Sequence, residues 1–188
     1  VSFILDTLYH SMDSVVCYSD SVKFLNTSNG IGMHFSWNFD DGTPLSSAVH
    51  PIHFFNTDTT RVYHITLTVT DTNNCINSYT KAITISRPVA FFGADRTKVD
   101  CPYPAPTIQF IDSSSFDNPI FNDSILSAWN FGTGTGIHST LTNPQFTYNT
   151  AGIYDITLII RNAYGCLDTL IRKDYIEIEG PSGSFSFT

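Results

Sequence analysis

The chain has 188 residues, of which 41% are hydrophobic and only 14% are charged, so it is able to build a packed core and is not a disordered segment. Its formal net charge of −8 disfavours nucleic acid as a partner, because the phosphate backbone is itself negative. No apolar run approaches the roughly 20 residues of a membrane helix, and no basic cluster could bind anionic lipid, so we expect no membrane insertion by this segment.

Six segments in the first half of the chain have the composition of β-strands and of the turns that join them. In chain order they are VSFIL (1–5), CYSDSVKFLNTS (17–28), WNFDDG (37–42), HPIHFF (50–55), VYHITLTVTDTNNC (62–75) and KAITI (81–85). The clearest strand begins at Tyr63, from which apolar and polar residues alternate as far as Thr70. This period of two indicates a strand with one buried and one solvated face.

The second half of the chain repeats these segments in the same order when Trp37 is aligned with Trp129. The matching segments are VAFFG (89–93), CPYPAPTIQFIDSS (101–114), WNFGTG (129–134), NPQFTY (143–148), IYDITLIIRNAYGC (153–166) and YIEI (175–178). One unit of about 90 residues therefore occurs twice. We expect one domain at 1–87 and a second at 88–180, and the tail at 181–188 is similar to the start of a further, truncated repeat of a longer tandem array.

Each unit has about seven short strand patterns and no sustained helical period, which predicts an all-β fold of two tandem immunoglobulin-like antiparallel β-sandwiches. The second copy of the tryptophan motif keeps both aromatic residues but has neither acidic residue of its turn. We therefore interpret the motif as packing rather than chemistry, since burying one tryptophan contributes roughly 4–6 kcal/mol before opposing terms. The expected core aromatics are Trp37, Phe39, Tyr63, Trp129, Phe131 and Tyr154.

The ordered motifs WNFDDG, HPIHFFNT and VYHITLTVTD resemble those of the PKD (polycystic kidney disease) domain, an immunoglobulin-like β-sandwich, and residues 143–166 match its later motifs closely. Asn38 and Asn130 depart from the family's usual aspartate. The resemblance implies a non-catalytic, secreted module that serves as a spacer and adhesive segment. Its paired cysteines are similar to those of long cell-surface adhesins of gliding bacteria that use type IX secretion.

This resemblance implies an extracellular location on a bacterial surface, with neighbouring repeats of the same chain as partners and a surface polysaccharide or protein as ligand. The alternative is a carbohydrate- or protein-binding accessory of a secreted hydrolase, which would need a row of exposed aromatic residues. The candidates for such a row are Tyr9, Tyr18, Tyr79, Tyr103 and Phe121. We expect no enzyme, because no nucleophile elbow, zinc-protease motif or phosphate-binding glycine loop occurs.

Four cysteines occur at equivalent places, two in each unit, which predicts the disulfides Cys17–Cys75 and Cys101–Cys166 and an oxidising compartment. A disulfide requires Cα atoms within about 7 Å. In a simple immunoglobulin layout, however, the start of the second strand and the last hairpin lie at opposite ends. Free thiols are therefore the alternative, unless the first segment folds back.

The acidic turn of the first unit offers one weak candidate for a cofactor site. Asp40 and Asp41 could bind calcium, because hard cations prefer several carboxylate oxygens. The simpler alternative is a turn in which each aspartate accepts hydrogen bonds from nearby backbone. We expect no other cofactor and no other metal.

Overall fold

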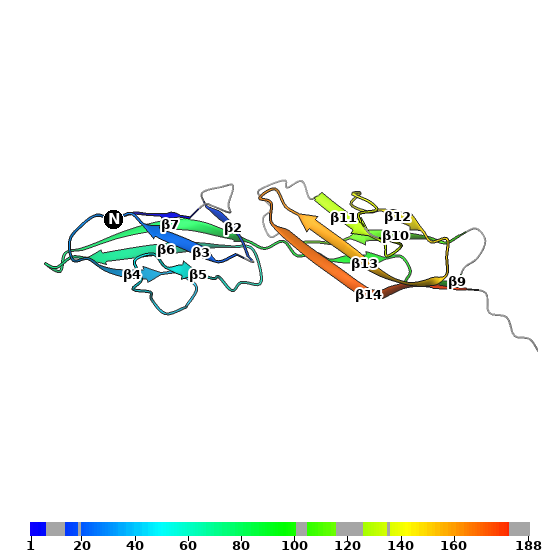
Figure 1. Ribbon diagram of the computed structural model, residues 1–188, viewed down its shortest axis with the longest axis horizontal. Helices are drawn as coiled ribbons and strands as arrows, with labels where there is room; N and C mark the ends of the chain where they lie inside the picture. Colours follow the sequence, from blue (N-terminus) through cyan, green and yellow to red (C-terminus); the bar gives the residue numbers. More distant parts are fainter. Residues whose placement is uncertain (7–13, 19, 101–104, 116–125, 135, 181–188) are drawn as a thin grey trace, which may run out of the picture. The chain divides into compact units, whose positions relative to one another are not determined.

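The computed structural model describes residues 1–6, 14–18, 20–100, 105–115, 126–134 and 136–180 (Figure 1). The chain divides into two compact units, Val1–Arg87 and Pro88–Thr188, which we call repeat 1 and repeat 2. The described residues form strands, turns and irregular segments, and none of them forms a helix that could cross a membrane. Residues 181–188, the expected start of a third repeat, lie outside the described part.

Repeat 1 is a sandwich of two sheets. Its strands are β1 (Phe3–Leu5), β2 (Val15–Cys17), β3 (Val22–Asn26), β4 (His34–Asn38), β5 (Ile52–His53), β6 (Arg61–Thr70) and β7 (Ile76–Ser86). One sheet has the order β1-β3-β5 and the other the order β2-β7-β6-β4 (Figure 1). All neighbours are antiparallel except β2, which runs parallel to β7 and places Cys17 opposite Ser86.

Repeat 2 has the same topology, strand for strand. Its strands are β8 (Phe92–Ala94), β9 (Lys98–Asp100), β10 (Thr107–Asp112), β11 (Leu126–Asn130), β12 (Gln145–Thr147), β13 (Gly152–Arg161) and β14 (Leu167–Glu179). The sheets have the orders β12-β10-β8 and β11-β13-β14-β9, and β9 runs parallel to β14. The prediction of two tandem immunoglobulin-like β-sandwiches is confirmed.

Alternation along the longest strands explains how each sandwich acquires one dry face. In β6, Tyr63, Ile65 and Leu67 are buried while the residues between them remain at least partly exposed. In β13, Ile156 and Leu158 are buried in the same way. Because successive side chains of a strand point to opposite faces, this pattern fixes the register at which each strand can pack.

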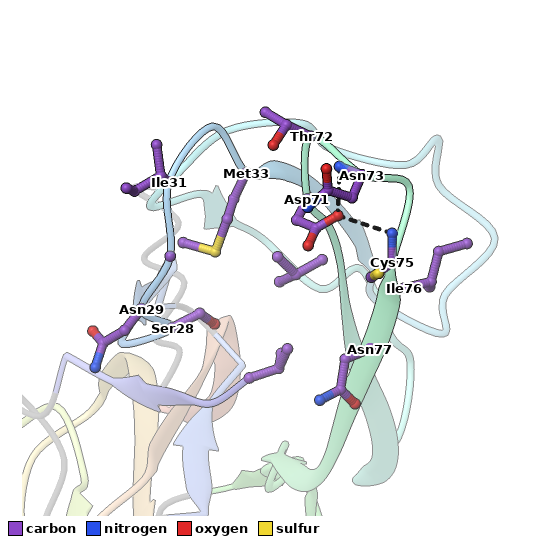
Figure 2. Close-up of a pocket in the computed structure, with 13 residues that line it drawn as sticks. Ser28, Asn29, Ile31, Met33, Asp71, Thr72, Asn73, Cys75, Ile76 and Asn77 are labelled. Carbon is purple, nitrogen blue, oxygen red and sulfur yellow. Dashed lines mark hydrogen bonds between the residues drawn. The ribbon is translucent and has the colours of Figure 1, made fainter.

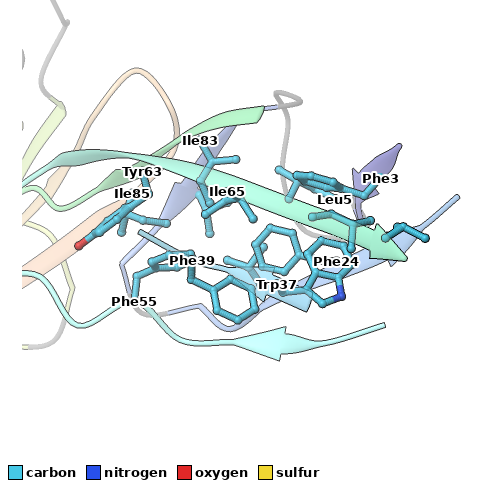
Figure 3. Packing of buried hydrophobic residues seen from close by; sticks show 14 residues of the cluster. Phe3, Leu5, Phe24, Trp37, Phe39, Phe55, Tyr63, Ile65, Ile83 and Ile85 are labelled. Atoms are coloured by element: carbon cyan, nitrogen blue, oxygen red, sulfur yellow. The ribbon is translucent and has the colours of Figure 1, made fainter. Parts of the chain in front are cut away.

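Aromatic rings fill the core of both repeats, and Figure 3 shows how they gather around Trp37 in repeat 1. Trp37 and Trp129 are both 0% exposed, and all six aromatics expected in the core are buried. The Phe3 ring meets Trp37 edge-on at 5.0 Å between centroids, and the Phe92 ring meets Trp129 in the same manner at 5.2 Å. Edge-to-face contacts at this separation are favourable for aromatic pairs beyond the area they bury.

Each tryptophan is also held by the segment that follows its strand. The Trp37 Nε1–H group donates to the carbonyl oxygen of Ala48 at 2.9 Å, and Trp129 donates equivalently to Leu141 at 2.9 Å. Isolated backbone bridges pair Trp37 with Ser46 and Trp129 with Ser139. A buried indole N–H needs such an acceptor, so this connection satisfies the one polar group of the core anchor.

Candidate functional site

The acidic turn after β4 is built from hydrogen bonds within repeat 1. Asp40 has a positive φ of 61°, and its backbone N–H donates to Asn38 Oδ1 at 2.9 Å. Its carboxylate accepts the backbone N–H of His64 at 3.0 Å. The side chain of Asn38 therefore closes the turn, and Asp40 ties it to β6.

The carboxylate of Asp41 is more enclosed, with a side chain that is 7% exposed. Its Oδ1 accepts hydrogen bonds from the Thr43 backbone N–H at 3.0 Å and from the Thr43 hydroxyl at 2.6 Å. Its Oδ2 lies 2.6 Å from His53 Nε2, and the His53 ring stacks on Phe39 at 3.9 Å between centroids. Burial raises the pKa of Asp41, but the hydrogen bonds from Thr43 and His53 outweigh it and hold the pKa below its ordinary value.

Repeat 2 makes the corresponding turn without an acid. Gly132 takes the place of Asp40 with a φ of 78°, and Asn130 Oδ1 accepts its N–H at 2.8 Å. A Cβ atom at Gly132 would lie 2.7 Å from the carbonyl oxygen of Asp155, so the close approach of the backbone requires glycine there. Phe146 stacks on Phe131 at 4.5 Å between centroids, as His53 does on Phe39.

Asp40 and Asp41 therefore take part in internal hydrogen bonds, as expected for the hydrogen-bonded turn. Among the described residues, no group of three or more His, Cys, Asp or Glu side chains is placed to hold a metal ion. The two acids serve different neighbours: Asp40 binds the backbone of β6, and Asp41 binds Thr43 and His53.

The hairpin between β6 and β7 is organised by one carboxylate. Asp71 Oδ1 accepts the backbone N–H groups of Asn73 at 2.8 Å and of Cys75 at 2.9 Å, as the dashed lines in Figure 2 show. In repeat 2, Asn162 Oδ1 accepts the N–H of Cys166 at 3.0 Å in the same manner. Sequence analysis missed this arrangement, although an Asp or Asn four residues before each hairpin cysteine was a signal that could have revealed it.

The cysteines do not pair as predicted within repeat 1. Cys75 is an exposed free thiol, whereas Cys17 is disulfide-bonded, so the predicted Cys17–Cys75 bond is wrong. The register of the sheet gives the reason. Cys17 lies opposite Ser86 at the last residue of β7, while Cys75 precedes its first residue, and a strand of 11 residues separates the two ends by about 33 Å. That is far beyond the roughly 7 Å that a disulfide permits between Cα atoms.

Cys166 is disulfide-bonded and buried, and Cys101, its predicted partner, lies outside the described residues. The residue before Cys101 in the sequence, Asp100, pairs with Glu179, which is the last residue of β14. Cys166 directly precedes the first residue of that 13-residue strand. The predicted pattern of one bond inside each repeat is therefore wrong, because repeat 1 has no such bond.

A pocket of about 470 Å³ adjoins Cys75 at the hairpin end of repeat 1 (Figure 2). It lies between the hairpin and the loop that leads into β4, which contributes Ile31 and Met33. Ile31 is 90% exposed and Ile76, from the start of β7, is 70% exposed. The free thiol therefore stands beside apolar side chains that no other described part of repeat 1 covers.

The opposite end of repeat 1 is held by Arg87. Its guanidinium donates to the Thr57 carbonyl oxygen, lies 3.3 Å from an oxygen of Asp58, and covers the Tyr18 ring at 4.0 Å from the centroid. The Arg87 backbone N–H donates to the Thr60 hydroxyl at 2.8 Å. The chain is therefore fixed to repeat 1 up to the residue that precedes Pro88.

The aromatic residues considered for a sugar-binding row are engaged where the structure describes them. Tyr18 lies beneath Arg87, and the Tyr79 ring meets Phe3 edge-on at 5.4 Å between centroids. Three further candidates, Tyr9, Tyr103 and Phe121, lie outside the described residues. Of the five candidates, the two that the structure describes are therefore each packed against a neighbour of their own.

Comparison with known proteins places both repeats in one family. The sequence pattern of the PKD domain matches residues 11–87 and again residues 86–178. No curated protein matches the chain. Among solved structures, the PKD1 domain of Vibrio anguillarum Epp is 22% identical to this chain, covers 49% of it and 95% of its own length, and has a TM-score of 0.37.

Two further solved structures are similar to the chain at lower identity. The three N-terminal domains of the bacteriophage RB49 Highly Immunogenic Outer Capsid protein are 13% identical, cover 85% of this chain and 54% of their own, and have a TM-score of 0.40. The fibronectin(III)-like modules of Clostridium thermocellum CbhA are 8% identical to this chain and have a TM-score of 0.37. The match covers 99% of this chain and 100% of theirs. Because the family pattern accounts for each repeat in turn, the chain belongs to the PKD domain family and consists of two tandem PKD domains.

Proposed function

We propose that this chain is a stiff stalk and spacer segment, with an adhesive role, of a large bacterial cell-surface adhesin. PKD domains are extracellular immunoglobulin-like repeat modules and are commonly non-catalytic. Tandem modules of this kind serve as spacers because each contacts only its neighbours along the chain. The placement of two cysteines in each repeat favours an adhesin of gliding bacteria that use type IX secretion, and a surface polysaccharide or a protein is the proposed ligand.

The observation that carries this proposal is the shortness of the junction between the repeats. Arg87 is hydrogen-bonded into repeat 1 through its backbone and its side chain. Val89 is bonded into repeat 2, where its backbone exchanges hydrogen bonds with Ser115 at 3.1 and 2.9 Å. Only Pro88 stands between them, and its ring fixes φ and removes a donor. A junction of one restricted residue is suited to a spacer that resists bending.

Small-angle X-ray scattering of the two-repeat chain tests the spacer role. Both proteins are measured with their disulfides reduced, so that only the junction is tested, and the control is a variant with eight Gly and Ser residues inserted after Pro88, which would act as a flexible linker. We expect the natural chain to scatter as one particle of defined maximum dimension and the control to show the broad distance distribution of two independent bodies. Indistinguishable curves for the two proteins would reject the spacer proposal.

Surface location and adhesion need a separate experiment in cells. Proteinase K added to intact cells that produce the natural full-length protein should degrade this segment, and a mutant that lacks type IX secretion should retain it undegraded. A glycan array probed with the purified two-repeat chain distinguishes the two ligand classes. Reproducible binding to one polysaccharide, together with a hydrolase domain in the same natural protein, would replace the adhesin proposal by the accessory alternative.

A further inference from the structure

The two hairpin cysteines occupy the same position in their repeats but differ in chemical state. Cys75 and Cys166 each donate a backbone N–H to the side chain that organises the hairpin, Asp71 in repeat 1 and Asn162 in repeat 2. Cys166 is disulfide-bonded and 2% exposed, whereas Cys75 is free and exposed. Repeat 2 therefore demonstrates that a cysteine at this hairpin position forms a disulfide.

The other cysteine of repeat 1, Cys17, lies at the end of β2, the strand that runs parallel to β7. It cannot reach the hairpin of its own repeat. Cys17 ends β2 beside Ser86, about 33 Å along β7 from the hairpin. Of the two bonded cysteines, Cys17 therefore holds the strand-end position and Cys166 holds the hairpin position. Within repeat 1 the two positions lie far outside disulfide range, so Cys75 can bond only to a cysteine of another repeat.

The surroundings of Cys75 suit contact with another protein domain. The pocket beside the thiol is about 470 Å³ in volume and has Ile31, Met33 and Ile76 on its wall. Ile31 and Ile76 are 90% and 70% exposed, and isoleucine side chains gain free energy when they are removed from water. The two exposed isoleucines, together with polar wall residues such as Asn73 and Asn77, would orient a partner before the covalent bond forms.

We propose that Cys75 is a covalent attachment point, at which repeat 1 forms a disulfide with a cysteine in the Cys17 position of another PKD repeat. This deepens the spacer proposal, on which it rests, by naming the chemistry that joins consecutive repeats. A series of such bonds would cross-link each repeat to its neighbour and would reinforce a stalk against extension.

The bond forms by thiol–disulfide exchange with a small-molecule disulfide as the oxidant. The Cys75 thiolate attacks one sulfur of that disulfide, which forms a mixed disulfide and releases one small-molecule thiolate. The thiolate of the partner cysteine then attacks the Cys75 sulfur and releases the second small-molecule thiolate. The two protein thiols lose two protons and two electrons in total, and the small-molecule disulfide accepts both electrons.

A second copy of this chain provides the partner for a direct test. Cys101 corresponds to Cys17 in the sequence, although it lies outside the described residues. The purified chain is incubated with reduced and oxidised glutathione, quenched with an alkylating agent, and examined by non-reducing electrophoresis and by mass spectrometry of linked peptides. We expect a ladder of oligomers, because a head-to-tail contact does not close on itself. The linked peptides should join Cys75 of one copy to Cys101 of the next.

Two variants separate docking from simple thiol reactivity. Cys75→Ser should abolish the ladder while leaving the bonds of Cys17 and Cys166 intact. The double variant Ile31→Thr, Ile76→Thr should slow ladder formation several-fold, while the reaction of Cys75 with a small aromatic disulfide reagent continues at the natural rate. Both isoleucines are exposed, so these substitutions should not impair folding.

Three outcomes would overturn the inference. They are dimers joined only through two Cys75 residues, glutathione adducts without cross-links, and a ladder whose rate ignores the two isoleucines. None of them would affect the scattering result, which depends on the junction at Pro88 and not on the thiol. Failure of the attachment point can therefore be distinguished from failure of the spacer function.

Discussion

At the scale of single residues, the position after β5 or β12 shows how the two repeats complete equivalent cores with different side chains. Phe55 in repeat 1 and Tyr148 in repeat 2 are both buried, and each packs against the tyrosine of the following long strand, at 4.7 and 4.5 Å between centroids. The Tyr148 hydroxyl donates to the carbonyl oxygen of Phe131 at 3.1 Å, and burial raises its pKa strongly. The hydroxyl is therefore a neutral, satisfied donor in a dry site.

This difference predicts the effect of Tyr148→Phe. The variant retains the ring and loses one buried hydrogen bond, which leaves the Phe131 carbonyl without this donor, so repeat 2 should lose about 1 kcal/mol of stability. Differential scanning calorimetry should show the repeat 2 transition lowered by about 4–8 °C, the shift expected for a domain of this size. The repeat 1 transition should not move, because Phe55 has no hydroxyl. An unchanged repeat 2 transition would mean that the hydroxyl contributes nothing to the free energy of unfolding.

At the scale of elements, the strand pattern was predictable and the connections were not. The period of two identified β6 and β13, and the tryptophan motif identified β4 and β11, because alternation and aromatic content follow directly from burial on one face. The cysteine pairing was wrong because it depends on which end of a strand meets which neighbour. The parallel pairing of β2 with β7, which decides this, is set by tertiary packing and leaves no local trace in the sequence.

The acidic turn illustrates the same distinction and yields a prediction about pH. Aspartate at a turn was predictable, but the enclosure of Asp41 by Thr43 and His53 was not. Because the pKa of Asp41 lies below its ordinary value of 3.8 in the folded state, its contribution to stability is fully present above pH 3.8. That contribution is lost as the pH falls through the lower, folded value, since protonation removes the charged acceptor.

Asp41→Asn should therefore destabilise repeat 1 by about 1–2 kcal/mol at pH 7, and the difference from the natural chain should shrink as the pH falls below 3.8. Urea unfolding at a series of pH values measures this. Repeat 2 is an internal control, since Gly132 and Thr133 stand in the equivalent turn and its unfolding should not respond to the substitution. A destabilisation of equal size at pH 7 and at pH 2.5 would contradict the role given to the carboxylate charge.

At the scale of the whole molecule, the proposed spacer function depends on how firmly each repeat holds its own end of the junction. Arg87 fixes the end of repeat 1 through the Thr57 carbonyl, the Thr60 hydroxyl and the Tyr18 ring. The sequence indicated a short linker from Pro88, but it gave no sign that the preceding arginine would fold back on its own domain. The stiffness proposed for this junction therefore rests on side-chain anchoring as well as on linker length.

Arg87→Ala should release the guanidinium contacts while leaving the backbone bond to Thr60 in place, so the end of repeat 1 should gain fast motion without unfolding of either repeat. Backbone ¹⁵N relaxation measures this, and the order parameters of residues 86 and 87 should fall from values near 0.85 towards 0.6. Arg61→Ala is the matched control, since Arg61 also covers a tyrosine ring, that of Tyr63 at 5.1 Å, and lies opposite Ile85 close to the junction, but makes none of the contacts of the Arg87 guanidinium. If both variants left residues 86 and 87 equally rigid, the stiffness of the junction would have to be attributed to Pro88 alone, because the ring restricts φ whether or not the arginine is anchored.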